Sequence, residues 1–186
     1  MIRQDHVRHL NRKLNKYHNN QKQSYNISKM KNYSKSQVFW LVALRMLIGW
    51  HFLYEGVVKV LNPKWTSLGY LMDSQGWFSS MFHSMAENQS VLNCVNFLNE
   101  WGLILIGLGL ILGCLARVAC IGGIAMLCLY FLSHPPFIGS EYMLPSEGSY
   151  MWVDKNLIEI AAIAVVYLFP TWHVFGLDKY IFKPKH

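Results

Sequence analysis

The sequence predicts an all-α integral membrane protein, a four-helix bundle with both termini in the cytoplasm. Apolar residues make up 53% of the chain and are gathered into blocks. Four of these blocks approach the ~20 residues that a helix needs to cross a bilayer core of ~30 Å. Basic residues lie mainly outside the blocks, where they can fix the topology.

We expect the four spans at residues 38–61, 97–115, 117–133 and 153–171. Paired prolines after His134 end the third span, because proline lacks the backbone N–H that continues a helix. Almost no loop separates the second span from the third, so these two should form an antiparallel hairpin. Glycine and alanine recur along both, which permits close approach of the two helices.

The orientation follows from the positive-inside rule. Nine of the 17 lysine and arginine residues precede Ser36, and with a cytoplasmic N-terminus the other inside segments add Arg117, Lys179, Lys183 and Lys185. Only Lys64 and Lys155 then lie outside. This distribution makes Arg117 a topology anchor, and it attributes the charge of +7 to membrane topology rather than to nucleic-acid binding.

Residues 1–37 are basic and polar, which predicts a disordered cytoplasmic tail. An alternative is a surface helix on anionic lipid, because Val7, Leu10, Leu14 and Tyr17 recur at helical spacing. Met30 is a candidate start of the natural protein. The membrane domain should cover residues 38–180, and a short basic tail of residues 181–186 follows it.

The first exterior loop, residues 62–96, should contain an amphipathic helix. From Trp77 to Met85 aromatic and methionine residues alternate at helical spacing with serine and histidine. We expect this helix to cap the outer end of the bundle. The four cysteines form no CxxC motif, and no spacing typical of metal ligands occurs, so we predict no metal site.

The first span carries Arg45, His51, Glu55 and Lys59 on one arc of about 120°. Arg45 lies in the inner half, where we expect it to act as an anchor that reaches cytoplasmic phosphates. The other three lie in the outer half. Ionisable groups inside a membrane are costly and commonly mark functional sites.

Polar residues of the other spans should join this outer cluster. Counting 1.5 Å per residue from the exterior ends places Glu55 and Glu159 at the same depth, about 9 Å below the surface. Glu100, His134 and Asn156 lie nearer the exterior. We expect Glu55, Lys59, Glu159 and His51 to act in catalysis, with His51 as a proton carrier, and Glu100, Asn156 and His134 to bind the substrate.

A structural role for the same groups stays open, because Glu55 and Lys59 at spacing i, i+4 can simply neutralise each other. For His51 a satisfied structural histidine is an equal alternative. A bis-histidine haem site is not expected, since only His51 lies deep in a span.

Several segments resemble the DoxX family, and most closely the DoxD subunit of thiosulfate:quinone oxidoreductase. They are residues 45–65, Gly69–Leu71, Asn99–Gly102 with the glycine-rich run to Arg117, Val153–Leu157 and Gly176–Asp178. The resemblance covers roughly residues 38 to 180. It implies a four-helix protein of the prokaryotic cytoplasmic membrane that takes part in passing electrons from sulfur compounds to quinone.

The leading hypothesis is therefore a membrane subunit of a quinone-linked oxidoreductase, with quinone as electron acceptor and a DoxA-like second subunit as partner. Such a chain would be an enzyme as part of a complex, and the sequence leaves its own catalytic activity and its self-association open. The competing hypothesis is a non-enzymatic membrane protein, either a small-solute transporter or an assembly factor.

Overall fold

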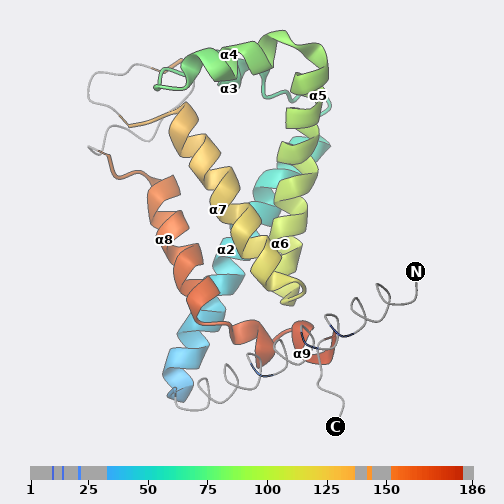
Figure 1. The fold of residues 1–186 in the computed structure, drawn as a ribbon, viewed down its shortest axis with the longest axis vertical. Helices are drawn as coiled ribbons and strands as arrows, with labels where there is room; N and C mark the ends of the chain where they lie inside the picture. Colours follow the sequence, from blue (N-terminus) through green and yellow to red (C-terminus); the bar gives the residue numbers. More distant parts are fainter. Residues whose placement is uncertain are drawn as a thin grey trace.

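The computed structural model describes residues 33–136, 142–143 and 152–181, together with Leu10, Leu14 and Gln21. All regular elements within these ranges are helical, which confirms the all-α prediction (Figure 1). They are α2 (Lys35–Leu61), α3 (Leu68–Met72), α4 (Ser79–Glu87), α5 (Gln89–Phe97), the π-helical turn η1 (Leu98–Gly102), α6 (Leu103–Leu112), α7 (Ala116–Ser133), α8 (Lys155–Leu168), the 3-10 turn η2 (Thr171–His173) and α9 (Asp178–Ile181). Helix α2 begins at Lys35, so the predicted tail of residues 1–37 ends earlier than expected, and Ile181 belongs to α9 rather than to the C-terminal tail. Apart from Leu10, Leu14 and Gln21, which are helical, the rest of the two predicted tails up to residue 32 and after residue 181, including Met30, lies outside the described residues.

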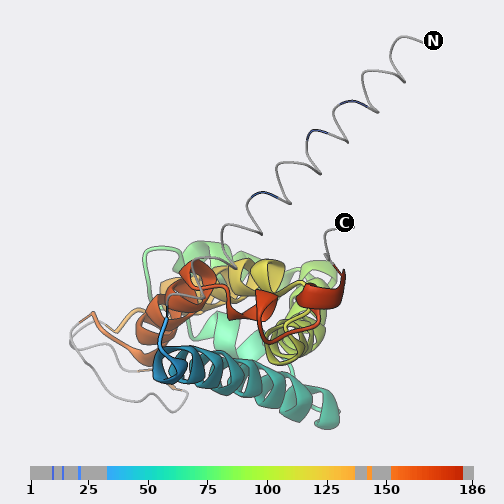
Figure 2. The same ribbon diagram turned by 90° about the horizontal axis from the view of Figure 1, so that it is seen from below.

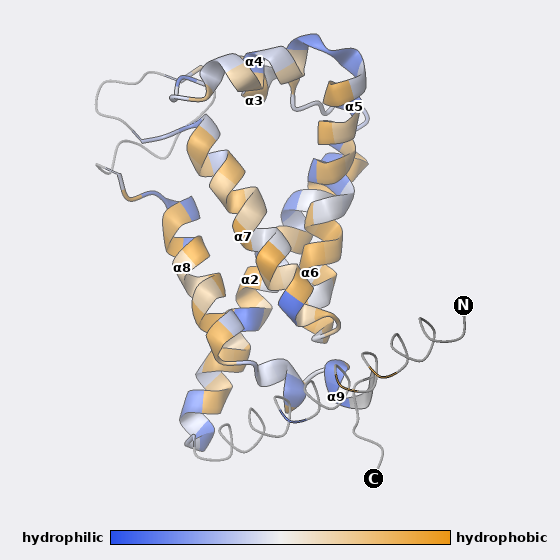
Figure 3. Ribbon diagram, viewed as in Figure 1, coloured by the Kyte–Doolittle hydropathy of each residue, from blue (hydrophilic) through white to orange (hydrophobic). Residues whose placement is uncertain are grey.

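Within the described ranges, three helices are long and apolar enough to cross a membrane. They are α2, the continuous helix Gln89–Leu112 formed by α5, η1 and α6, and α7. The helix expected as a fourth span, α8, has 14 residues and is shorter than these three. Figure 3 shows that apolar residues cover most of α6, α7 and α8, whereas hydrophilic positions interrupt α2 along its length.

The long helices form the body of the bundle, and short helices lie across its two ends. Helices α3 and α4 cross one end, and η2 and α9 lie at the other (Figure 1). Residues 169–181, called the C-terminal segment below, follow α8. Seen from below, they pass across this second end of the bundle (Figure 2). The core lies between the long helices and is built from residues such as Phe52, Leu103, Leu110 and Ile163.

Glycine residues allow α2 and α6 to pack backbone against backbone. A Cβ atom on Gly107 would lie 2.5 Å from the Leu53 nitrogen, and one on Gly56 would lie 2.8 Å from the Ile104 nitrogen. Both distances are too short for any larger residue, so this contact requires glycine. The same contact fixes the position of the polar residues of α2 relative to η1 and α6.

The turn between α6 and α7 is as short as predicted. Gly113 and Leu115 adopt left-handed backbone conformations with φ of 62° and 50°. Such φ angles suit glycine and strain leucine. The Asp178 carboxylate stabilises the turn by accepting hydrogen bonds from the backbone nitrogens of Leu115 and Ala116 at 2.8 and 3.2 Å.

A helix is also found where the amphipathic segment was predicted. Helix α4 begins two residues later than Trp77, at Ser79. Helix α4 buries Phe82 and Ala86 in a second small core. Of the residues predicted for its apolar face, Phe82 is buried, whereas Trp77 and Phe78, which precede the helix, and Met81 are exposed. The helix is therefore confirmed, but the predicted apolar face is not the buried one.

Substitution of Gly107 by alanine should weaken the contact between α2 and α6. Overpacking of this kind typically costs about 1–3 kcal/mol of folding stability, and thermal unfolding of the purified protein in detergent would measure the loss. Gly102→Ala is the matched control in the same continuous helix, because a Cβ there meets nothing within 4 Å. Equal stability of the two variants would contradict this packing.

Candidate functional site

The ionisable residues of α2 contact different partners at successive levels along the helix. Arg45 contacts the C-terminal segment, His51 contacts α8, and Lys59 contacts Glu55 and aromatic residues. Within the outer cluster expected from the sequence, His51 is paired with Glu159 and Lys59 with Glu55.

The His51–Glu159 pair joins α2 to α8. The Nδ1 atom of His51 lies 2.8 Å from Oε1 of Glu159, so the two share a hydrogen bond. The Glu159 side chain is 12% exposed, whereas that of His51 is 44% exposed. The pair therefore presents an imidazole at the surface of the bundle, with a carboxylate behind it that fixes the ring and stabilises its protonated form.

The expectation that Glu159 lies level with Glu55 is wrong, because Glu159 is paired with His51, one turn further from the exterior end of α2. Helix α8 begins at Lys155, later than the expected Val153. Its start also lies lower in Figure 1 than the end of α7. Counting residues from assumed boundaries could not account for this offset.

The Lys59–Glu55 pair lies one to two turns further along α2. The Nζ atom of Lys59 is 3.7 Å from Oε2 of Glu55, and the lysine is 16% exposed while the glutamate is 49% exposed. Nζ also lies 5.4 Å from the ring centroid of Trp65 and 5.7 Å from that of Tyr130. Aromatic faces attract a cation, so they help to hold the ammonium inside the bundle.

Tyr130 and Asn99 also belong to this group, although neither was predicted as a site residue. The Tyr130 hydroxyl donates a hydrogen bond to Oδ1 of Asn99 at 2.5 Å, which fixes the ring beside Lys59. Asn99 lies in the π-helical turn η1, and such turns occur frequently at functional sites. Asn99 could have been predicted, because an asparagine within an apolar span is unusual. Tyr130 could not, because in the sequence it resembles any other core aromatic residue.

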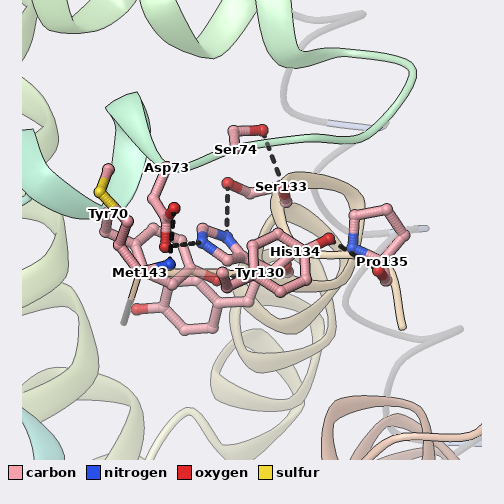
Figure 4. A network of polar contacts seen from close by, with 9 residues as sticks. Tyr70, Asp73, Ser74, Tyr130, Ser133, His134, Pro135 and Met143 are labelled. Carbon is pink, nitrogen blue, oxygen red and sulfur yellow. Dashed lines mark hydrogen bonds and ion pairs between the residues drawn. The ribbon is translucent and has the colours of Figure 1, made fainter. Parts of the chain in front are cut away.

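A further group surrounds His134 at the end of α7 (Figure 4). The His134 ring stacks on the ring of Tyr70, with 3.9 Å between the ring centroids, and its centroid lies 4.7 Å from that of Tyr142. Nδ1 is 3.0 Å from the Ser133 hydroxyl, and Nε2 is 3.7 Å from the buried Asp73 carboxylate. This group ties Tyr142 and Met143 to α3 and α7.

The other predicted site residues lie apart from these groups. Glu100 is half-buried in η1, beside the close contact with Gly56. The Asn156 amide donates a hydrogen bond of 2.7 Å to the Asp154 carboxylate, so it helps to stabilise the start of α8. Arg117 is exposed at the start of α7, 5.9 Å from the ring of Tyr167.

The expectation that the Arg45 side chain reaches lipid phosphates is wrong. It is only 2% exposed, and Nη2 donates a hydrogen bond of 2.6 Å to the carbonyl oxygen of Phe175. The C-terminal segment covers it, a contact between residues that are far apart in sequence. Arg45 therefore anchors this segment to the bundle.

Comparison with known proteins identifies the class of membrane protein. The DoxX family profile matches residues 40–135, which include most of α2, all of α3 to α7 and most of the groups described above. The chain therefore belongs to the DoxX family. No curated protein and no solved structure matches it significantly. Within the described residues, no group of histidine, cysteine and carboxylate side chains is arranged to hold a metal ion.

Burial lowers the pKa of His134 below its ordinary value of 6.5, and nearby Asp73 opposes this effect. The folded protein then binds a proton at His134 less readily than the unfolded chain does. Stability should fall as the pH drops below about 6.5 toward the lower pKa of the folded state. His134→Gln should reduce the dependence of thermal unfolding on pH between 7 and 5, and an unchanged dependence would contradict this assignment.

The His51–Glu159 contact should appear as a coupling energy. We expect His51→Gln and Glu159→Gln to be non-additive in a double-mutant cycle by about 1 kcal/mol or more, measured by unfolding in detergent. The cycle of His51→Gln with Glu100→Gln is the control, and its effects should be additive because Glu100 lies on another helix away from His51. Additivity in both cycles would show that the hydrogen bond contributes nothing.

Proposed function

We propose that this chain is the quinone-interacting membrane subunit of an oxidoreductase. The observation that carries the proposal is the half-exposed imidazole of His51, backed by the Glu159 carboxylate on the side of the bundle. A quinone dissolved in the bilayer can approach such a group laterally. In this proposal α8 is the fourth span, both termini are cytoplasmic, and the protein lies in a prokaryotic cytoplasmic membrane, where it acts as a DoxD-like subunit.

Reduction of a quinone to a quinol consumes two electrons and two protons. His51 has Nδ1 bonded to Glu159, so its Nε2 can donate a proton to a quinone carbonyl while Glu159 stabilises the ring. Glu55 and Lys59 can supply the second proton from the adjacent pair. The electrons come from a sulfur compound such as thiosulfate, through a second subunit similar to DoxA.

The distribution of basic residues supports the proposed orientation. With a cytoplasmic N-terminus, η2, α9 and the exposed Arg117 lie on the inner side, and α3 and α4 lie on the outer side. Lys179 then joins the inside residues and Lys64 the outside ones, in agreement with the positive-inside rule. His51 and Glu159 fall within the membrane between the two ends.

Glu159→Gln should lower quinone reduction by about 100-fold or more, because it removes the carboxylate that supports proton transfer. The assay would follow reduction of a quinone analogue with thiosulfate in the purified complex. Glu87→Gln, at the exposed end of α4, is the control and should retain full activity. Full activity of Glu159→Gln, at normal levels in the membrane, would remove this residue from the mechanism.

A non-enzymatic role has one observation in its favour. Glu55 and Lys59 neutralise each other within α2, as a purely structural pair would. If Glu55→Gln and Glu159→Gln both disappear from the membrane, and the purified protein carries no quinone and shows no redox activity, the transporter or assembly-factor hypothesis replaces the enzyme.

A further inference from the structure

Arg45 is a buried cation that lies on α2 about 9 Å along the helix axis from His51. It is 2% exposed, and its Nη2 donates to the Phe175 carbonyl at 2.6 Å. Phe175 in turn donates its backbone N–H to the carbonyl of Thr171 at 2.8 Å. The guanidinium is therefore enclosed between α2 and the turn that follows α8.

Most of the donors of this guanidinium have no protein partner. Among the described residues, neither Nε nor Nη1 of Arg45 makes a hydrogen bond, and the buried hydroxyl of Thr171 makes none either. Arg45 also forms no ion pair within the residues that the structure describes. A buried charge without a partner is strongly destabilising, so these groups point to an additional ligand.

Asp178 does not supply the missing hydrogen bonds. Its two carboxylate oxygens accept from the backbone nitrogens of Leu115 and Ala116 at the start of α7. The positive end of that 18-residue helix offsets much of the Asp178 charge. Among the described residues of this region, the carboxylate of Asp178 is therefore the single negative charge beside two positive groups, the start of α7 and the Arg45 guanidinium.

The surroundings restrict the size of a ligand. A Cβ atom on Gly113 would lie 3.2 Å from Nη1 of Arg45 and 3.3 Å from Cβ of Trp172. Trp172 and Thr171 are each 1% exposed. A lipid headgroup, which must stay attached to its acyl chains, cannot reach a guanidinium enclosed in this way. A small free ion carries no such attachment.

We propose that Arg45 binds a small monovalent inorganic anion of the halide class. Nε and Nη1 of Arg45 and the hydroxyl of Thr171 are its donors. The anion neutralises the guanidinium and strengthens the attachment of the C-terminal segment to the bundle. This site is independent of the proposed quinone chemistry, because it uses none of the same side chains.

The test is thermal unfolding of the full chain in detergent at constant ionic strength, with chloride or bromide replacing gluconate. Halide should raise the unfolding temperature in a saturable manner, by about 5 °C at concentrations well above the dissociation constant. An equal unfolding temperature in halide and gluconate at every concentration would overturn the proposal.

Variants separate this site from general salt effects. Arg45→Gln should abolish the halide-dependent shift and Thr171→Val should reduce it, whereas Arg117→Gln, an exposed arginine at the same end of the bundle, should leave it unchanged. A shift that persists in Arg45→Gln would place the ion elsewhere. If Arg45→Gln does not fold, line broadening of the chloride NMR signal by the wild type, reduced in Thr171→Val, decides the question.

Discussion

Helix α2 brings four ionisable side chains into an apolar environment, and the rest of the structure depends on how their charge is accommodated. Each is matched in a different way. Arg45 donates one hydrogen bond to the backbone of a distant segment and, in our proposal, binds an anion with its other donors. His51 uses a carboxylate on α8, and Lys59 uses its neighbour Glu55 together with aromatic faces. A membrane offers no water to replace a lost partner, so each contact restrains the position of the helix that provides it.

The close approach of α2 and α6 determines where these charges lie. Because Gly49, Gly56 and Gly107 remove the side chains that would separate the two backbones, α2 is held directly against η1 and α6. Asn99 of η1 then fixes Tyr130 of α7 beside Lys59. Backbone packing and polar contacts are consequently parts of one arrangement, and a change at a glycine should also displace the site.

The sequence allowed the helical elements to be predicted because their signals are local. The apolar blocks, the prolines after His134 and the alternation around Phe82 depend only on neighbouring residues. The partners across the bundle were harder to predict. Glu159 pairs with His51 although 108 residues separate them, and this depends on the offset of α8, which no local pattern encodes.

Two further features escaped prediction for related reasons. The burial of Arg45 follows from the path of the segment after α8, which no periodic pattern describes. The role of Tyr130 depends on a π-helical turn in another helix. The family assignment, in contrast, was within reach of the sequence, because the motifs that carry it lie in continuous segments such as residues 45–65.

We propose that quinone meets this protein at His51 and Glu159, on the side of α2 and α8. The most direct test is labelling of the membrane-embedded complex with a photoreactive quinone, followed by mapping of the labelled peptides by mass spectrometry. The account predicts labels on α2 around His51 and on α8 around Glu159, which excess unlabelled quinone prevents. Labels confined to α3 and α4, or labelling that excess quinone does not reduce, would contradict it.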